Sequence, residues 1–340
     1  MEYYTGDDFA SIEKYDTHVH LNIPETSLIT QSEQDNYKLI TINVDVASEF
    51  PTIEEQQIVA INLSKAFPDV VNYSCTFSVK NFNDESWIEE TIASLEASIS
   101  RGAIAVKVWK NIGMELKDAN DNFVMIDNPK FDPVFGFLEK NNIPLIGHLG
   151  EPKNCWLPLE QMTVQGDVNY FSTHPKYHMY LHPEYPLYED HINARDHILE
   201  KHPGLQFVGA HLGSLEWDVD EIAKRFDKFP NMAVDTASRI SHLQHQAKTN
   251  WQKIYDFFIK YQDRIIYGTD IIIRPTNNPL ETKKESHDIR LRHWNFFSSD
   301  ETMSVPKVEG EFKGLRLPCK VVDKIYRTNA KKWFQGLVKK

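Results

Sequence analysis

The sequence predicts a (β/α)₈ barrel, because short β-rich runs alternate with longer helical stretches and eight such runs occur. This alternation is typical of a parallel sheet covered by helices, and eight units are the number that closes a barrel. The expected strands, in order, are Tyr15–His20, Lys38–Asp45, Val70–Phe77, Ala103–Trp109, Ile143–Leu149, Leu205–His211, Met232–Asp235 and Arg264–Asp270.

Helical segments fill the gaps between these runs. Three of them end in a polar or basic stop with Pro, followed within a few residues by a strand, at 141–144, 201–204 and 228–231. Such short αβ turns fit the barrel. The expected helices are Pro51–Phe67, Asp84–Arg101, Asp132–Asn141, Tyr188–Lys201, Leu215–Phe229 and Thr249–Tyr261, with Thr282–Phe297 and Cys319–Phe334 after the last strand.

The chain is expected to be one domain, residues 1–340, because no linker separates a second unit. Its 340 residues exceed the roughly 250 of a minimal barrel. A connection of nearly forty residues after the fifth strand, about 150–187, and a C-terminal helical extension, about 280–340, account for the surplus. A βα connection of that length is usually a lid or small subdomain.

Composition excludes several classes of partner. Lys and Arg total 37 against 49 Asp and Glu, a net charge of −12, which argues against nucleic acid. No apolar run reaches the roughly 20 residues of a membrane span, and the acidic start is unlike a signal peptide. Cys75, Cys155 and Cys319 are unpatterned, which suits a reducing compartment. We expect a cytoplasmic protein with a small-molecule substrate, and a homodimer is a possible assembly.

Two histidines stand at the end of the first expected strand. Residues two apart on a strand share a face, so His18 and His20 point together while Val19 points away. Two adjacent imidazoles form a natural metal-binding pair, although an alternating, half-buried strand gives the same pattern.

Three later strands also deliver a polar group where they end. His148 and His211 each precede a Leu-Gly pair after an apolar run, and Asp270 ends the run Ile265–Asp270. Each residue taken alone could be a satisfied core group or a cap. Together they lie on the face where barrel active sites are built, because that face is formed by the carboxyl ends of the strands.

These ligand types suit a divalent metal with an open position. Neutral His ligands and one Asp leave net positive charge, which lowers the pKa of bound water and stabilises an oxyanion. His211 or Asp270 is then placed to move protons. The His-rich set favours Zn²⁺, with Mn²⁺ and Fe²⁺ as alternatives.

The pattern resembles the amidohydrolase superfamily, in particular the branch that contains aminocarboxymuconate semialdehyde decarboxylase and related hydrolases. The resemblance rests on HxH at 18–20, His-Leu-Gly after the fifth and sixth strands and Tyr-Gly-Thr-Asp at 267–270. The stretches 194–196, 314–318 and 324–330 are also similar. It spans most of the chain apart from the long insertion and parts of the tail.

The resemblance implies a role for each motif residue. His18, His20, His148 and Asp270 would be metal ligands, and His211 would polarise the substrate or act as a base. In binuclear members His211 would be a ligand instead, and Asp270 would also be the base.

Lys107 departs from a simple mononuclear pattern. It alternates with Ala105 on the face of its strand opposite Val106 and Val108, so it should point into the barrel. A bare ammonium beside a divalent cation is unfavourable. Three roles stay open: a carboxylated lysine that bridges two metals, an unmodified cation near the substrate, or a partner of Glu151.

Weaker candidates for substrate contacts lie near the expected mouth of the barrel. A guanidinium suits a substrate carboxylate, although a structural salt bridge is the alternative for each Arg. These candidates are Glu151, Trp156, Asp235, Arg239 and Arg274.

His174, His178 and His182 recur every four residues in the long insertion, which on one helix would form a metal-binding face. Pro175 and Pro183 argue against such a helix. We expect a lid that packs on the barrel, with a second metal site as the alternative.

The sequence thus predicts a metal-dependent hydrolase in which activated water attacks the carbonyl of a small carboxylate, lactone or amide. The alternative reaction at the same site is nonoxidative decarboxylation of an unsaturated or aromatic carboxylic acid. A metal-stabilised binding protein without catalysis is a third reading, disfavoured because a scaffold needs no open coordination position.

Overall fold

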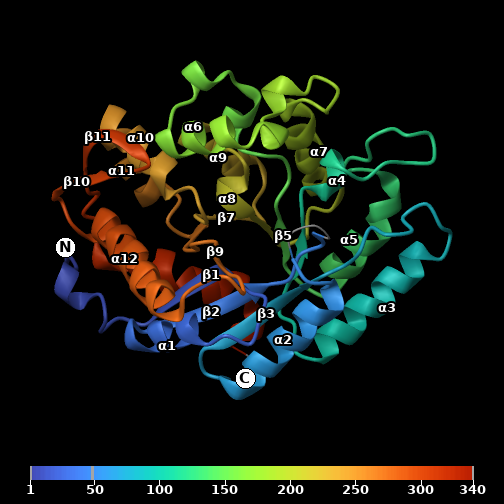
Figure 1. Cartoon of the computed structure of the whole chain (residues 1–340), viewed down its shortest axis with the longest axis horizontal. Helices are drawn as coiled ribbons and strands as arrows, with labels where there is room; N and C mark the ends of the chain where they lie inside the picture. The colour runs from blue at the N-terminus through green and yellow to red at the C-terminus, as the bar shows by residue number, and fades with distance from the viewer. Residues whose placement is uncertain (1, 47–49, 339–340) are drawn as a thin grey trace.

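A parallel sheet forms the centre of the molecule (Figure 1). The computed structural model describes residues 2–46 and 50–338. The strands of the main sheet are β1 (Lys14–Leu21), β2 (Tyr37–Ile42), β3 (Val71–Thr76), β4 (Val106–Val108), β5 (Leu145–Gly147), β6 (Phe207–Gly209), β7 (Met232–Asp235), β8 (Ile265–Ile266) and β9 (Ile271–Ile273).

The two edges of this sheet belong to one stretch of chain. The strand order is β8-β7-β6-β5-β4-β3-β2-β1-β9, so β8 pairs with β7 and β9 pairs with β1. The segment that joins β8 to β9 also bonds to β1. The Thr17 N–H donates to the Tyr267 carbonyl (3.1 Å), and the Asp270 N–H donates to the His18 carbonyl (2.7 Å). β8 and β9 are therefore the two halves of the eighth barrel strand, interrupted where Asp270 lies.

Helices follow the strands and lie outside them, as Figure 1 shows, so the predicted (β/α)₈ fold class is confirmed. No helix in the described residues is long and apolar enough to cross a membrane. The α-helices are α1 (Ser27–Gln34), α2 (Ile53–Ala66), α3 (Trp87–Ser100), α4 (Asn111–Met114), α5 (Asp132–Lys140), α6 (Gln165–Thr173), α7 (Tyr188–Lys201), α8 (Ala210–Gly213), α9 (Val219–Lys228), α10 (Ile240–Thr249), α11 (Trp251–Lys260), α12 (Pro279–Ser298), α13 (Cys319–Asp323) and α14 (Asn329–Trp333).

Several features differ from the expected elements, and three of them lie in the long connection and the C-terminal extension. The connection 150–187 contains α6 and four short 3₁₀ turns: η3 (Lys153–Trp156), η4 (Leu159–Gln161), η5 (Pro175–Tyr177) and η6 (Met179–Leu181). The C-terminal helix is split by a π-helical stretch, η7 (Lys324–Thr328). An antiparallel hairpin, β10 (Thr302–Val305) with β11 (Val308–Lys313), follows α12 and was not expected, because its strands alternate only weakly.

Small and branched side chains fill the barrel interior. Ala105, Ile146, Val208 and Ala233 belong to one inner cluster, which Trp333 of α14 also joins. Trp333 therefore connects the C-terminal extension to the core of the barrel.

A buried ion pair ties α12 to the first and eighth strands. Arg290 donates through Nη2 to Asp16 Oδ2 (3.0 Å), and both side chains are fully buried. Asp16 also accepts from the backbone N–H (2.9 Å) and hydroxyl (2.7 Å) of Thr269. This pair therefore anchors the residue that precedes Asp270.

Replacing Arg290 with Met is expected to lower the free energy of unfolding by about 3–5 kcal/mol, because it leaves the buried Asp16 carboxylate without its counter-ion. Urea unfolding followed by circular dichroism measures the change. The exposed Arg292 on the same helix is the matched control, and its replacement with Met should change stability by less than about 0.5 kcal/mol. Equal effects of the two variants would contradict the anchoring role.

Candidate metal centre

Three predicted ligands converge at the carboxyl ends of the strands. His18 and His20 of β1 and Asp270 between β8 and β9 each offer an atom that lies within 4.8 Å of the others. Asp270 Oδ1 lies 3.3 Å from His20 Nε2 and 3.6 Å from His18 Nε2. Two atoms that ligate one tetrahedral ion at about 2.1 Å lie about 3.4 Å apart. The spacing of these donors therefore fits a single divalent cation.

The other ring nitrogen of each histidine is already used. His18 Nδ1 donates to Asp235 Oδ2 (2.7 Å), and His20 Nδ1 donates to the Ile42 carbonyl (2.8 Å). These bonds fix the tautomer, so each Nε2 is left as a lone-pair donor toward Asp270. Burial lowers the pKa of His20, which keeps its ring in the neutral form that a metal needs.

Asp270 is held in an uncommon backbone conformation. Its φ is 69°, in the left-handed region, and its N–H donates to the His18 carbonyl. Ser238 Oγ donates to Asp270 Oδ2 (2.9 Å), which leaves Oδ1 facing the histidines. Burial opposes ionisation, but the contact with His20 and the nearby His211 and His18 hold the pKa of Asp270 well below its usual value.

His211 and His148 form a second pair beside the three ligands. Their ring centroids are 4.2 Å apart, and His211 lies 4.9 Å from His18. His211 Nδ1 donates to the Ala237 carbonyl (2.9 Å), so Nε2 is its acceptor, and burial lowers its pKa to about 3. His148 is not among the three residues whose ligand atoms lie within 4.8 Å of one another. Its place as a fourth ligand therefore stays a prediction.

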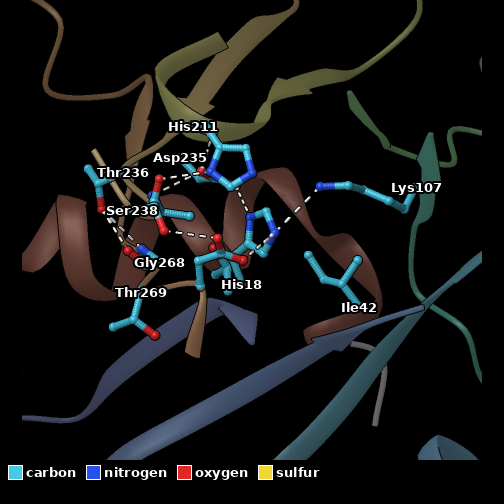
Figure 2. A network of polar contacts seen from close by, with 12 residues as sticks. His18, Ile42, Lys107, His211, Asp235, Thr236, Ser238, Gly268 and Thr269 are labelled. Carbon is cyan, nitrogen blue, oxygen red and sulfur yellow. Dashed lines mark hydrogen bonds and ion pairs between the residues drawn. The ribbon is translucent and has the colours of Figure 1, made fainter. Parts of the chain in front are cut away.

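Lys107 points into the barrel, as its strand alternation predicted. Its Nζ lies 3.4 Å from His18 Nε2, and Figure 2 shows it extending from β4 toward that ring. Burial lowers its pKa to about 8. Of the three roles left open for Lys107, the pairing with Glu151 is not found, because Glu151 bonds to Lys110, which follows the strand end. The bridging and substrate-binding roles of Lys107 stay predictions.

The centre opens into a cavity of about 480 Å³. Glu151, Arg239 and Arg274 line it, and their contact with a substrate stays a prediction. Trp156 and Asp235 do not. Trp156 packs on Tyr188, with ring centroids 5.6 Å apart, because the chain turns away in η3.

Asp235 lies behind the ligands instead of facing the substrate. Its Oδ2 accepts from His18, and its Oδ1 accepts from the N–H groups of His211 (2.8 Å) and Ala237 (3.1 Å) (Figure 2). Asp235 is therefore placed to orient His18 and the His211 backbone.

Replacing Asp235 with Asn is expected to lower metal affinity by about 10–100-fold. The amide oxygen can keep the two backbone N–H bonds, but the amide NH₂ then faces His18 Nδ1 and favours the tautomer with a proton on Nε2. Calorimetric titration with Mn²⁺ measures the affinity, and circular dichroism checks the fold. An unchanged affinity in a folded variant would contradict the orienting role.

The insertion histidines do not share a ligand position. His174 Nδ1 bonds to the Tyr170 carbonyl (2.8 Å), His178 Nε2 to the Leu157 carbonyl (2.7 Å) and His182 Nε2 to the Pro175 carbonyl (3.0 Å). They lie at the ends of separate short helices, as the prolines predicted. The lid interpretation is thus favoured over a second metal site.

Several cavity residues were missed because they come from elements without a strand-end signal. The lid supplies Gly166, Asp167, Tyr170 and Phe171, and the β10–β11 hairpin supplies Lys307. Their positions depend on how the lid and the hairpin pack over the barrel, which no local pattern reveals.

Comparison with known proteins places the chain in a family. The family model described as Amidohydrolase matches residues 81–336. The chain belongs to the amidohydrolase family. Members of this family are enzymes that use divalent metals, and this amidohydrolase presents a donor set that fits one. No protein of curated function matches its sequence.

Solved structures share the fold of this amidohydrolase over nearly its whole length. The 2,6-dihydroxybenzoate decarboxylase from Rhizobium is 15% identical, with a TM-score of 0.56 over 95% of this chain and 98% of that one. A putative amidohydrolase from Staphylococcus aureus is 13% identical, with a TM-score of 0.53 over 95% and 100%. The 5-carboxyvanillate decarboxylase from Novosphingobium aromaticivorans, solved with bound manganese, is 13% identical, with a TM-score of 0.50 over 98% and 100%.

Proposed function

We propose that this amidohydrolase is a divalent-metal-dependent enzyme that removes CO₂ from a small aromatic or unsaturated carboxylic acid. The observation that carries the proposal is the charge of the cavity around the metal centre. Its described lining holds five basic side chains, Lys107, Lys110, Arg239, Arg274 and Lys307, and three carboxylates, Glu151, Asp167 and Asp270. Such a lining favours an anionic substrate.

The apolar part of the lining fits a planar substrate. Phe50, Trp109, Tyr170 and Phe171 lie along the same cavity as the basic groups. Aromatic side chains offer flat faces on which a ring or conjugated chain can pack. Two of the solved structures that share the fold are decarboxylases of aromatic acids by name, which supports this substrate class.

A divalent cation held by His18, His20 and Asp270 would supply positive charge that polarises a substrate oxygen. We infer Zn²⁺ first from the histidine-rich donor set, with Mn²⁺ and Fe²⁺ as alternatives. Lys107, which also faces the cavity, would add to the positive field around the substrate carboxylate.

In this proposal His211 moves the proton that the reaction needs. Its Nδ1 is committed to the Ala237 carbonyl, so Nε2 would take up a proton from a substrate hydroxyl or from water and pass it on. The substrate carbon that carries the carboxylate would gain this proton, and a π electron pair of the substrate would form the new C–H bond. The C–C bond would then break, its electron pair would restore the π bond and CO₂ would leave. The lid residues Tyr170 and Phe171 would limit water at the site.

Hydrolysis is the second candidate and was the leading prediction from sequence. It is favoured by the carboxylate of Asp270, which lies among the metal ligands and lines the cavity, where it can take a proton from attacking water. It would require a substrate with an ester, lactone or amide bond.

A substrate panel on metal-loaded protein separates the two reactions. Aromatic and muconate-like acids are tested beside lactones, esters and amides, with CO₂ release and product mass as the readouts. In ²H₂O, decarboxylation should place one deuterium on the carbon that lost CO₂. If hydrolysis products form without CO₂, the second candidate function replaces the proposal. If no substrate of any tested class is turned over, both candidates are contradicted.

A further inference from the structure

We propose that Arg239 and Lys307 form an anion subsite on the lid side of the cavity, which binds a second anionic group of the substrate. The substrate would then be a dianion, such as a dicarboxylate, with one carboxylate at the metal centre and the other at this subsite. The inference rests on the proposed function for its substrate, but its test measures binding and needs no turnover.

Arg239 lines the cavity without a salt-bridge partner among the described residues. It stands between β7 and α10, and among the described residues no carboxylate lies within the 4.0 Å of a salt bridge to it. Its Nε is buried without a hydrogen-bond partner, and its Nη1 makes only a long contact with the Ser238 carbonyl (3.5 Å). A guanidinium in this state lacks the planar acceptor that suits it best.

Lys307 brings to the same cavity a second cation that has no salt-bridge partner among the described residues. It lies in the turn between β10 and β11, and its backbone carbonyl accepts from the Gly166 N–H (3.3 Å). A Cβ on Gly166 would lie 3.2 Å from Lys307 Cγ, so the aliphatic part of the Lys307 side chain packs closely against the lid at Gly166. No described carboxylate is within salt-bridge distance of its ammonium. Burial and then the charge of Arg239 lower its pKa, and the nearby carboxylates Asp167 and Asp270 oppose this shift.

Hydrogen bonds from α10 and the start of α11 hold the β10–β11 hairpin in this position. Lys248 near the end of α10 donates to the Glu309 carbonyl (2.7 Å), and Trp251 donates to the Gly314 carbonyl (2.9 Å). The fold therefore holds two cations near each other despite their repulsion. The N-terminus of α10 faces the cavity through Ser238 and Ser241, and its dipole adds to the positive field.

Each cavity carboxylate already has a partner other than Arg239 and Lys307. Glu151 pairs with Lys110, and Asp270 lies with the metal ligands. Asp167 accepts from His242 (3.0 Å) and Asn154 (2.9 Å). An anionic group of a ligand is therefore the natural neutralising partner for Arg239 and Lys307.

The test is calorimetric binding of simple acids to Mn²⁺-loaded protein. Benzoate carries one carboxylate, and phthalate, isophthalate and terephthalate carry two at increasing separation. We expect at least one dicarboxylate to bind roughly tenfold tighter than benzoate. Lys307→Met should remove most of this advantage while benzoate binding stays nearly constant, and Lys307→Arg should restore it.

Lys313→Met is the matched control. Lys313 ends the same hairpin and lies 6.0 Å from the Trp251 ring, outside the cavity lining, so the same charge is lost without touching the subsite. This control should keep the dicarboxylate advantage. The proposal is overturned if no dicarboxylate binds tighter than benzoate, if the advantage survives Lys307→Met, or if Lys313→Met removes it equally. Dicarboxylate binding without turnover would instead count against the proposed function alone.

Discussion

Replacing Asp270 with Asn is expected to weaken metal binding by at least about 100-fold and to abolish turnover within detection. Asp270 is the one carboxylate in the donor group, and Ser238 and the His18 carbonyl hold it in place. Asn keeps the shape but removes the negative charge that neutralises a bound cation. Loss of a group that supports a ligand typically costs about 10–100-fold in affinity, so loss of the ligand itself should cost more.

Calorimetric titration of Mn²⁺ into metal-free protein measures this effect. Asp300→Asn is the control, because Asp300 is exposed and pairs with Arg316 on the surface. The control should bind metal as the parent does. Unchanged metal affinity in Asp270→Asn would show that Asp270 is not a metal ligand.

Replacing His211 with Gln is expected to lower turnover by about 10²–10⁴-fold while one metal per chain stays bound, because the variant loses its proton-transfer group. His211 contacts His18 and His148 and bonds to the Ala237 carbonyl, but its ligand atoms are outside the group of three. Steady-state turnover and metal analysis are measured on the same preparation.

His245→Gln is the matched control for this variant. His245 lies on α10, outside the cavity lining, and its replacement should leave turnover unchanged. If His211→Gln loses metal instead, His211 is a ligand, as the resemblance allows for binuclear members. Full turnover in His211→Gln would contradict its proton-transfer role.

The sequence predicted what depends on strand alternation and strand ends. His18 and His20 share a face because they are two residues apart, and Lys107 points inward opposite Val106 and Val108. Asp270 ends an apolar run, and the break between β8 and β9 at that point places it toward His20.

The site predictions that were wrong or missing depend on packing between distant segments of the chain. Asp235 also ends a strand, but its neighbours His18 and His211 take both of its oxygens, so it faces the ligands and not the substrate. Lys307 reaches the cavity only because the hairpin packs beside α10 and the lid. Neither result follows from residue spacing along the chain.

Anomalous diffraction from crystals of the Mn²⁺-loaded protein would locate the bound cation. We expect a strong peak between His18 Nε2, His20 Nε2 and Asp270 Oδ1, about 2.1 Å from each atom. The same map would reveal whether Lys107 carries a carboxylate. No peak at this position, or a peak only elsewhere in the molecule, would contradict the metal centre and the function proposed on it.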